Sequence, residues 1–272
     1  MFLPLEYKSK KKKKFSEKLV REKIFNKIDT NLHFLLKKRF LWMKKYFPKK
    51  RKKIIIELGS GSGCIRKILK NDNIILTDIV KFPWINQKID MYKMNLDKKF
   101  INKVDVFIIN HALHHCSNPV RCLKLIMKYL KNDGVILINE PETSFFLKLI
   151  QLITSDEGWS YKKNIFDTSV DFFNSKDPWF SNTATGELLF KDEKKFKKHF
   201  PKLKILKNNL SEFFIFINSG GVNSDIFKIP LNKFFLKFLN ILDKILISLF
   251  PNIFALNRSI VLQKIKYNNN WQ

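Results

Sequence analysis

The sequence predicts an α/β fold in which a mostly parallel sheet carries helices on both faces. Three observations support this prediction. Short apolar runs alternate with helical patterns from Ile54 to Asn139, as expected for parallel strands joined by crossover helices. The first apolar run leads directly into a glycine-rich turn at residues 59–63. Polar or acidic residues follow the ends of the runs, where sheets of this kind bind their ligands.

The first predicted strand, residues 54–56, consists of three isoleucines and is followed by Glu57. A β-branched run of this kind is typical of a buried parallel strand. Glycine then occupies every second position, at Gly59, Gly61 and Gly63. Glycine permits a sharp turn and lets a ligand approach the backbone more closely than a Cβ atom would allow. We therefore expect a ligand-binding loop between this strand and the next helix.

Two phosphate-binding loops do not fit this segment. The dinucleotide fingerprint requires its third glycine at position 64, which is Cys64. The phosphate loop of nucleotide triphosphatases ends in Gly-Lys-Ser/Thr, and the segment has no such ending. An acid at position 57 would repel a pyrophosphate, but it suits a ligand that carries an amine and a sulfonium. A glycine-rich turn without a ligand is the alternative.

Two further strands are predicted before residue 100. The apolar run at residues 73–76 is followed by Asp78. Nucleoside-binding βαβ units place the acceptor for the ribose hydroxyls at this point, and the alternative for Asp78 is a plain turn residue. Residues 88–91 form a weaker candidate strand, with Asp90 near its end.

The remaining parallel strands have stronger apolar patterns. Residues 105–110 are largely apolar and lead into the histidine-rich segment 111–115. A helix is predicted over residues 118–130, because Asn-Pro at its start is a common helix beginning. An Asn-Asp-Gly stretch then ends this helix, and residues 135–139 form a fifth strand that is followed by Glu140.

Two of these patterns together resemble the class I S-adenosylmethionine-dependent methyltransferases, specifically the type 11-like methyltransferase domain. They are the acid-x-Gly-x-Gly-x-Gly pattern and the run HALHH … NP … LKLIMKYLKNDGVILINEP. One departure is Val135, where the family usually has a second glycine, and we expect a shifted loop there. The resemblance implies a Rossmann-like class I methyltransferase fold with a seven-stranded, mostly parallel sheet. Its last two strands, antiparallel at the sheet edge, would come from residues 204–210 with 213–217, and from 259–265.

The resemblance also implies S-adenosyl-L-methionine as the cofactor. Asp78 would accept hydrogen bonds from the ribose hydroxyls, Asp90 would accept one from the adenine amine, and the backbone amide of Met91 would meet the adenine ring. The full set of expected cofactor-binding residues is Glu57, Gly59, Gly61, Gly63, Asp78, Asp90, Met91, Asn110 and His111.

Methyl transfer from a sulfonium is an in-line displacement, so positioning of the acceptor and exclusion of water supply most of the catalysis. A base is needed only when the acceptor is a hydroxyl or an acidic carbon. The candidate bases are His114, His115 and Glu140, and a structural role is the alternative for each histidine. The candidate residues for an acceptor pocket, or for a plain loop, are Asp177, Trp179 and Asn182.

The methyltransferase domain is predicted to cover residues 51–266, with additions at both ends. Its parts are a cofactor half at 51–141, a lid and acceptor region at 142–200, and an insertion with an amphipathic helix at 219–255. Residues 1–50 form a basic helical extension with 17 Lys and Arg against 4 Asp and Glu. Residues 267–272 are a short tail.

Within the insertion, apolar residues recur at helical three/four spacing over residues 231–250. Lys237, Asp243 and Lys244 interrupt the stripe, so a transmembrane span is not expected. The helix either packs over the sheet or the substrate cleft, or lies on a membrane surface. The second interpretation fits a lipid-linked substrate and predicts peripheral membrane contact, although the polar face has few basic residues for such a helix.

The formal net charge of +28 over 272 residues raises nucleic acid as a partner. However, 46 of the basic residues are Lys and 6 are Arg, whereas phosphate and base-edge recognition favours the planar fork of Arg. Nucleic acid is therefore not the expected partner. The abundance of Lys, Asn, Ile and Phe indicates an A/T-rich coding genome, and an anionic membrane or glycan is the next interpretation.

Cysteine usage and the N-terminus favour a cytoplasmic protein, peripheral to the inner membrane face if the apolar stripe lies on lipid. Cys64, Cys116 and Cys122 show no zinc-binding spacing, so reduced thiols and no metal are expected. No secretory signal is predicted, because no apolar stretch closely follows the lysine run at residues 10–14.

Together these patterns predict an S-adenosylmethionine-dependent methyltransferase that acts on a small-molecule or lipid-linked acceptor, with a sugar hydroxyl of a surface glycan as the leading candidate. Features between residues 177 and 221 resemble a subgroup linked to bacterial surface-polysaccharide and lipid modification. RNA methylation is one alternative. A non-catalytic binding module that retains the fold is another, although the intact acid and glycine pattern argues against it.

Overall fold

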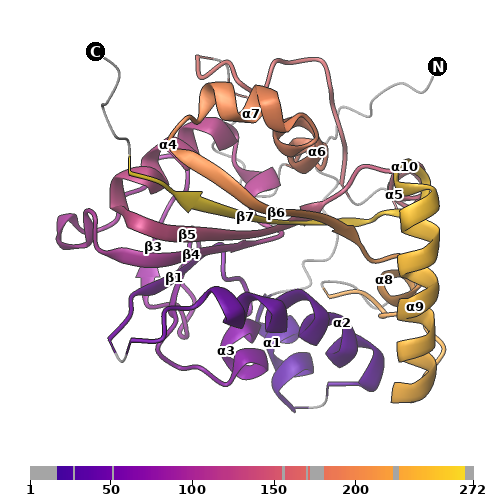
Figure 1. Ribbon diagram of the computed structural model, residues 1–272. Helices are drawn as coiled ribbons and strands as arrows, with labels where there is room; N and C mark the ends of the chain where they lie inside the picture. The colour runs from indigo at the N-terminus through magenta and orange to yellow at the C-terminus, as the bar shows by residue number, and fades with distance from the viewer. Residues whose placement is uncertain are drawn as a thin grey trace.

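A seven-stranded sheet forms the centre of the protein in the computed structural model, which describes residues 17–26, 28–50, 52–154, 157–169, 171, 181–222 and 227–266. The strands lie in the order β3-β2-β1-β4-β5-β7-β6 (Figure 1). Only β7 runs antiparallel, and it pairs with both β5 and β6. The strands are β1 Ile55–Leu58, β2 Ile75–Asp78, β3 Gln87–Lys88, β4 Val104–Asn110, β5 Leu130–Pro141, β6 Leu203–Ser211 and β7 Asn257–Lys264. The predicted seven-stranded, mostly parallel sheet is confirmed.

Helices cover both faces of this sheet (Figure 1). On one face lie α1 Glu17–Asn26, α2 Thr30–Leu41 and α3 Cys64–Leu69. On the other lie α4 Pro119–Tyr129, α6 Thr185–Phe190 and α7 Glu193–His199. Each face has its own apolar core, because side chains of β1, β4 and β5 alternate between the two sides. Burial of these two cores supplies the main favourable term in folding.

A third group of helices lies at the carboxyl ends of the parallel strands. It consists of α5 Phe145–Thr154, α8 Phe214–Ile217, α9 Lys233–Leu249 and α10 Pro251–Phe254. These helices share a small apolar cluster that includes Leu147, Phe213 and Ile247. The long helix α9 falls between β6 and β7 in the sequence and forms one edge of the molecule (Figure 1). None of the helices in the described ranges combines the length and hydrophobicity needed to cross a bilayer.

Three expectations about the strands were wrong in detail. The fifth strand, β5, begins at Leu130, so the Asn-Asp-Gly stretch lies within it and does not form the expected loop. The third strand is only Gln87–Lys88, so Asp90 lies two residues beyond its end. Residues 213–217 do not continue β6, because a helical turn, α8, occupies Phe214–Ile217. The carboxylate of Asp243 in α9 accepts hydrogen bonds from the backbone amides of Phe213 (3.0 Å) and Phe214 (2.8 Å), which caps this turn.

The N-terminal helices belong to the same packed body as the sheet. Val20, Ile24 and Leu32 are fully buried against it. Arg39 of α2 makes a bidentate ion pair with Glu212, which follows β6, and both side chains are almost completely buried. Two short 3₁₀ turns, Trp42–Tyr46 and Leu113–His115, follow α2 and β4. The described part of the basic extension, residues 17–26 and 28–50, is therefore part of the structure that surrounds the carboxyl ends of the strands.

Candidate active site

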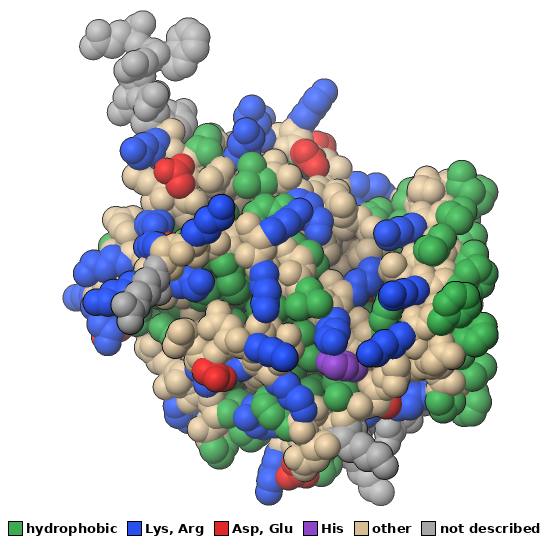
Figure 2. All heavy atoms as spheres, turned by 60° about the horizontal axis from the view of Figure 1, so that its bottom comes forward, with side chains coloured by type: hydrophobic (Ala, Val, Ile, Leu, Met, Phe, Trp, Pro, Cys, Tyr) green, Lys and Arg blue, Asp and Glu red, His purple; other side chains and the backbone are tan. Residues whose placement is uncertain are grey.

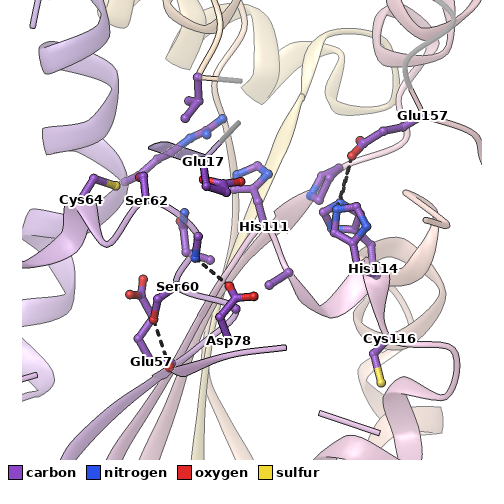
Figure 3. A pocket seen from close by; sticks show the side chains of 18 of the residues that line it. Glu17, Glu57, Ser60, Ser62, Cys64, Asp78, His111, His114, Cys116 and Glu157 are labelled. Atoms are coloured by element: carbon purple, nitrogen blue, oxygen red, sulfur yellow. Dashed lines mark hydrogen bonds and ion pairs between the residues drawn. The ribbon is translucent and has the colours of Figure 1, made fainter. Parts of the chain in front are cut away.

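A cavity of about 570 Å³ lies at the carboxyl ends of the parallel strands. Its walls come from the loops that follow β1, β2, β3 and β4 and from helices α1, α2 and α5. This position is the one in which open parallel sheets bind ligands. Figure 3 shows its two chemically distinct sides, with Glu57, Ser60 and Asp78 on one side and His114 and Glu157 on the other.

The glycine loop between β1 and α3 forms the first side. Gly59 has φ +69°, and a Cβ atom there would come within 2.5 Å of the Cβ atom of Ala112. Gly61 has φ +46° and faces the carboxylate of Glu17, 3.0 Å from the position that a Cβ atom would take. Gly63 also has a positive φ, but it does not line the cavity, and its missing Cβ makes room for Leu76 instead. Gly59 and Gly61 thus line the cavity, whereas Gly63 is required by the packing of Leu76.

Two acids flank the glycine loop. Glu57 is 3% exposed, and its Oε2 atom has no hydrogen-bond partner in the described part of the chain. Burial raises the pKa of Glu57 to about 8. Asp78 accepts a hydrogen bond from the Gly61 amide at 2.8 Å and another from the Val80 amide at 3.0 Å, while burial raises its pKa. Asp78 therefore fixes the loop and keeps its carboxylate at the cavity wall.

The other expected cofactor contacts also reach the cavity. Asp90 and Met91 line it beside β3, and an oxygen of Asp90 accepts a hydrogen bond from the Tyr92 amide at 2.8 Å. Asn110 and His111 line it at the end of β4. His111 has φ +50°, its Nε2 atom lies 3.1 Å from Asn257 Oδ1, and burial lowers its pKa so that the ring is neutral at pH 7.

The second side of the cavity centres on His114. Its Nδ1 atom lies 2.5 Å from Glu140 Oε2, and its Nε2 atom lies 3.3 Å from Glu157 Oε1. These two carboxylates raise the pKa of His114 to about 10 against the opposing effect of burial, while the neighbouring imidazoles lower the pKa of Glu157 to about 2. His114 is therefore an imidazolium at neutral pH and is not available to accept a proton.

Of the three predicted bases, only two line the cavity. Glu140 is fully buried behind the wall, where its carboxylate accepts hydrogen bonds from the amides of Ala112 and Leu113 at 3.0 and 2.7 Å. It holds the loop after β4 in place. His115 lines the cavity, with 29% of its side chain exposed and its Nε2 atom 3.6 Å from Glu157 Oε1.

Of the predicted acceptor-pocket residues, Asn182 is not brought to this cavity. Asn182 is buried in a turn. Its side chain exchanges hydrogen bonds with the backbone of Ser160, and its backbone amide donates a hydrogen bond to the His114 carbonyl. Asp177 and Trp179 lie outside the described residues.

Sequence reasoning missed two carboxylates in the cavity, Glu17 and Glu157. Glu17 is the first residue of α1, in a segment that resembles no part of the family. Glu157 follows α5 in a stretch without strand or helix periodicity. Neither position carried a sequence signal, because both depend on how distant segments pack around the sheet.

Glu17 leads to a prediction about the pH dependence of stability. Burial, and then the nearby Asp78, raise the pKa of Glu17 from 4.5 to about 7. The folded state therefore binds the Glu17 proton more tightly than the unfolded state does. This proton contributes to the free energy of unfolding below about pH 4.5, and the contribution is lost as the pH rises through about 7. Glu17→Gln removes this loss, so we expect it to stabilise the protein by about 1–2 kcal/mol at about pH 8 and little at about pH 4. Urea unfolding at both pH values measures the effect, and an equal effect at both would contradict it.

The donor set of the first side fits S-adenosylmethionine. The buried, unpaired Oε2 atom of Glu57 requires a donor or a cation, which the amine of the cofactor can supply. Gly59 and Gly61 line the cavity, so a ligand can approach their backbone. Asp78 retains acceptor capacity beyond its two backbone hydrogen bonds, as a ribose contact requires.

Comparisons with known proteins agree with this fold. Residues 56–138 match a family described as "Methyltransferase domain". The structure is similar to an S-adenosylmethionine-dependent methyltransferase from Archaeoglobus fulgidus, at 17% identity and a TM-score of 0.51, covering 90% of this chain and 98% of that one. It is also similar to phosphoethanolamine N-methyltransferase 2 from Haemonchus contortus in complex with S-adenosylmethionine, at 11% identity and a TM-score of 0.46, covering 94% and 59% of the two chains. No curated protein matches the chain. The predicted fold class is confirmed, and residues 56–138 match the predicted methyltransferase domain.

Proposed function

We propose that this chain, which has the class I methyltransferase fold and matches a methyltransferase domain over residues 56–138, is an S-adenosylmethionine-dependent methyltransferase that methylates the polar head of a lipid-linked acceptor at a membrane surface. The observation that supports this proposal is an exposed apolar face on α9 that continues along α5 to the wall of the cavity. An acceptor anchored in lipid would reach the cavity across this surface.

The apolar face of α9 is unusually exposed. Its residues and exposed fractions are Phe234 (73%), Phe238 (50%), Ile241 (53%), Ile245 (49%) and Leu249 (63%). These positions follow helical three/four spacing and form one stripe, visible as the apolar edge in Figure 2. Lys233, Lys237 and Lys244 are exposed on the same helix. Apolar side chains beside lysines suit the interface of an anionic bilayer.

Helix α5 connects this face to the cavity. α9 packs against α10, and α10 packs against α5. Ile153 of α5 is 75% exposed and also lines the cavity, together with Ile150. Phe145, at the start of α5, is 56% exposed. The cavity therefore opens next to apolar surface, which favours an acceptor with an apolar anchor over a fully hydrated one.

The cofactor would occupy the glycine-loop side of the cavity. We assign Glu57, Asp78, Asp90 and the loop backbone to holding it, and bound S-adenosylmethionine supplies a methyl group on a sulfonium. The chain contributes binding, orientation and the exclusion of water by the helices that cover the strand ends. The acceptor group would then face His114, His115 and Glu157, and a sugar hydroxyl is our leading candidate for it. A hydroxyl must lose its proton, and His115 is the predicted base that faces the cavity.

The membrane part of this proposal predicts the behaviour of a triple variant, Phe234→Ser, Phe238→Ser and Ile241→Ser. Each of these side chains loses about 1.5–3 kcal/mol of apolar transfer free energy when it no longer enters lipid. We therefore expect binding to vesicles that contain anionic lipid to weaken by at least about tenfold. Co-sedimentation measures this binding.

The matched control is Leu19→Ser, Leu41→Ser and Leu206→Ser, which removes three leucines that are 48%, 43% and 40% exposed on other elements. The control should bind vesicles like the wild type. Equal loss in both variants, or no vesicle binding by the wild type, would contradict a membrane role for α9.

The contacts of the arginines give less support to RNA methylation than the exposed apolar face of α9 gives to a lipid-linked acceptor. The guanidinium groups of Arg39 and Arg258 are paired with Glu212 and Glu142, and that of Arg66 is hydrogen-bonded to the Ile74 carbonyl. They are thus used within the protein and not presented to phosphates. Strong RNA affinity that falls steeply with salt would favour this alternative.

A further inference from the structure

We propose that His114, His115 and Glu157 bind a divalent transition-metal cation, with zinc as the ion that best suits the donors, on the acceptor side of the cavity. The coordinating atoms would be the Nε2 atoms of the two histidines and an oxygen of Glu157. No other group of three such side chains comes together in the part of the chain that the structure describes.

The spacing of the three donor atoms suits one cation. Each residue offers a ligand atom, and all three atoms lie within 4.8 Å of one another. Glu157 Oε1 lies 3.3 Å from His114 Nε2 and 3.6 Å from His115 Nε2. Ligand atoms at about 2.0–2.2 Å from a tetrahedral zinc are separated by distances of this order. Small side-chain adjustments would therefore close the site around an ion.

Glu140 gives the site the support that metal-binding histidines usually have. Its carboxylate contacts the Nδ1 atom of His114 at 2.5 Å, on the opposite side of the ring from Nε2. A carboxylate in this position fixes the ring, and a metal bound at Nε2 would displace the proton that His114 carries there in the ion-free protein. The same carboxylate binds the backbone amides of the loop that carries both histidines. The two histidine ligands are thus preorganised, while Glu157 arrives from the segment after α5.

The charges around His114 also favour a cation. Two carboxylates, Glu140 and Glu157, contact the buried ring of His114, so a cation bound at its Nε2 atom would lie near two negative charges. In Figure 3, Glu157 and His114 face each other at the side of the cavity away from the glycine loop. Two imidazoles and one carboxylate, with the remaining position open to a cavity, form the donor set of catalytic zinc sites.

The position of the cation would explain how a polar acceptor is recognised. All three ligands line the cavity, so an open coordination position would face it. A hydroxyl, or two neighbouring hydroxyls of a sugar, could occupy that position and be held at a fixed place. This part of the inference rests on the proposed acceptor, whereas metal binding itself does not. It gives His115 a ligand role in place of that of a free base.

Cobalt binding tests the site without an assay of activity. Purified full-length protein is treated with a chelator and titrated with Co²⁺ alone, with its visible absorption as the readout and Zn²⁺ as competitor. We expect one Co²⁺ per chain, displaced by Zn²⁺, and a loss of affinity of at least about 100-fold in His115→Ala and Glu157→Gln. Glu140→Gln should weaken binding by about 10–100-fold, as expected for an outer-shell partner.

The control is His199→Gln, because His199 is exposed on α7 and distant in sequence from the site; it should bind Co²⁺ like the wild type. Calorimetry with S-adenosylmethionine on every variant shows that the cofactor side is intact and keeps this test separate from the proposed acceptor. Absence of Co²⁺ binding in the wild type, or unchanged affinity in both His115→Ala and Glu157→Gln, would overturn the metal site. Loss of activity in His115→Ala without any metal binding would identify His115 as the base.

Discussion

Gly59→Ala is expected to reduce the affinity for S-adenosylmethionine at least about 100-fold, which corresponds to about 3 kcal/mol of binding free energy. Two effects combine at this position. Alanine is disfavoured at φ +69° by about 1–2 kcal/mol, and its Cβ atom would lie 2.5 Å from that of Ala112. The clash would push the glycine loop away from the neighbouring loop after β4, and both loops line the cavity. Isothermal titration calorimetry measures the change.

Gly63→Ala is the matched control for this variant. Gly63 has a similar φ of +68°, but it does not line the cavity, and its nearest neighbour would be the flexible end of Leu76 at 2.8 Å. We expect it to lower stability while cofactor affinity falls by less than about tenfold. Equal loss of affinity in both variants would mean that the effect of Gly59 is global unfolding and not the geometry of the cavity.

Glu212→Ala is expected to have the largest effect on stability, lowering the free energy of unfolding by about 3–5 kcal/mol. Arg39 and Glu212 are 4% and 1% exposed, and two guanidinium nitrogens contact the carboxylate at 3.0 and 2.7 Å. The variant leaves a buried guanidinium without its anion. Because Arg39 also lines the cavity, the loss should loosen α2 from the strand ends. Urea unfolding provides the measurement.

Lys191→Ala is the comparison for Glu212→Ala. Lys191 makes an ion pair with Glu187 at 2.8 Å, but its side chain is 56% exposed. Exposed pairs contribute about 1 kcal/mol or less, so this variant should differ little from the wild type. A cost for Glu212→Ala as small as that of Lys191→Ala would show that α2 is not anchored through this pair.

The site residues that could be predicted from the sequence are those that lie at or just after the end of a strand. Glu57 and Asp78 lie at the carboxyl ends of β1 and β2, and His111 follows β4; apolar runs identify where such strands end. Their arrival at one cavity follows from the parallel topology alone. The weakest strand pattern gave an inaccurate end for the third strand, since β3 has only two residues and depends on pairing with β2.

What the sequence could not predict depends on side-chain direction and on distant packing. Glu140 follows a strand end as expected, yet its carboxylate turns away from the cavity to bind the amides of Ala112 and Leu113. Residues 213–217 have a strand-like composition, but Asp243, about thirty residues away, caps them as a helix. Glu17 and Glu157 reach the cavity only because α1 and the segment after α5 pack beside it.

The most direct test of the account is a calorimetric titration of the wild-type chain with S-adenosylmethionine and, separately, with a dinucleotide that carries a pyrophosphate. The unpaired carboxylate of Glu57 and the carboxylate of Asp78 predict one cation-bearing adenosyl ligand per chain, and no measurable binding of the pyrophosphate. Binding of the dinucleotide in place of S-adenosylmethionine, or of neither ligand, would contradict the assignment of this cavity.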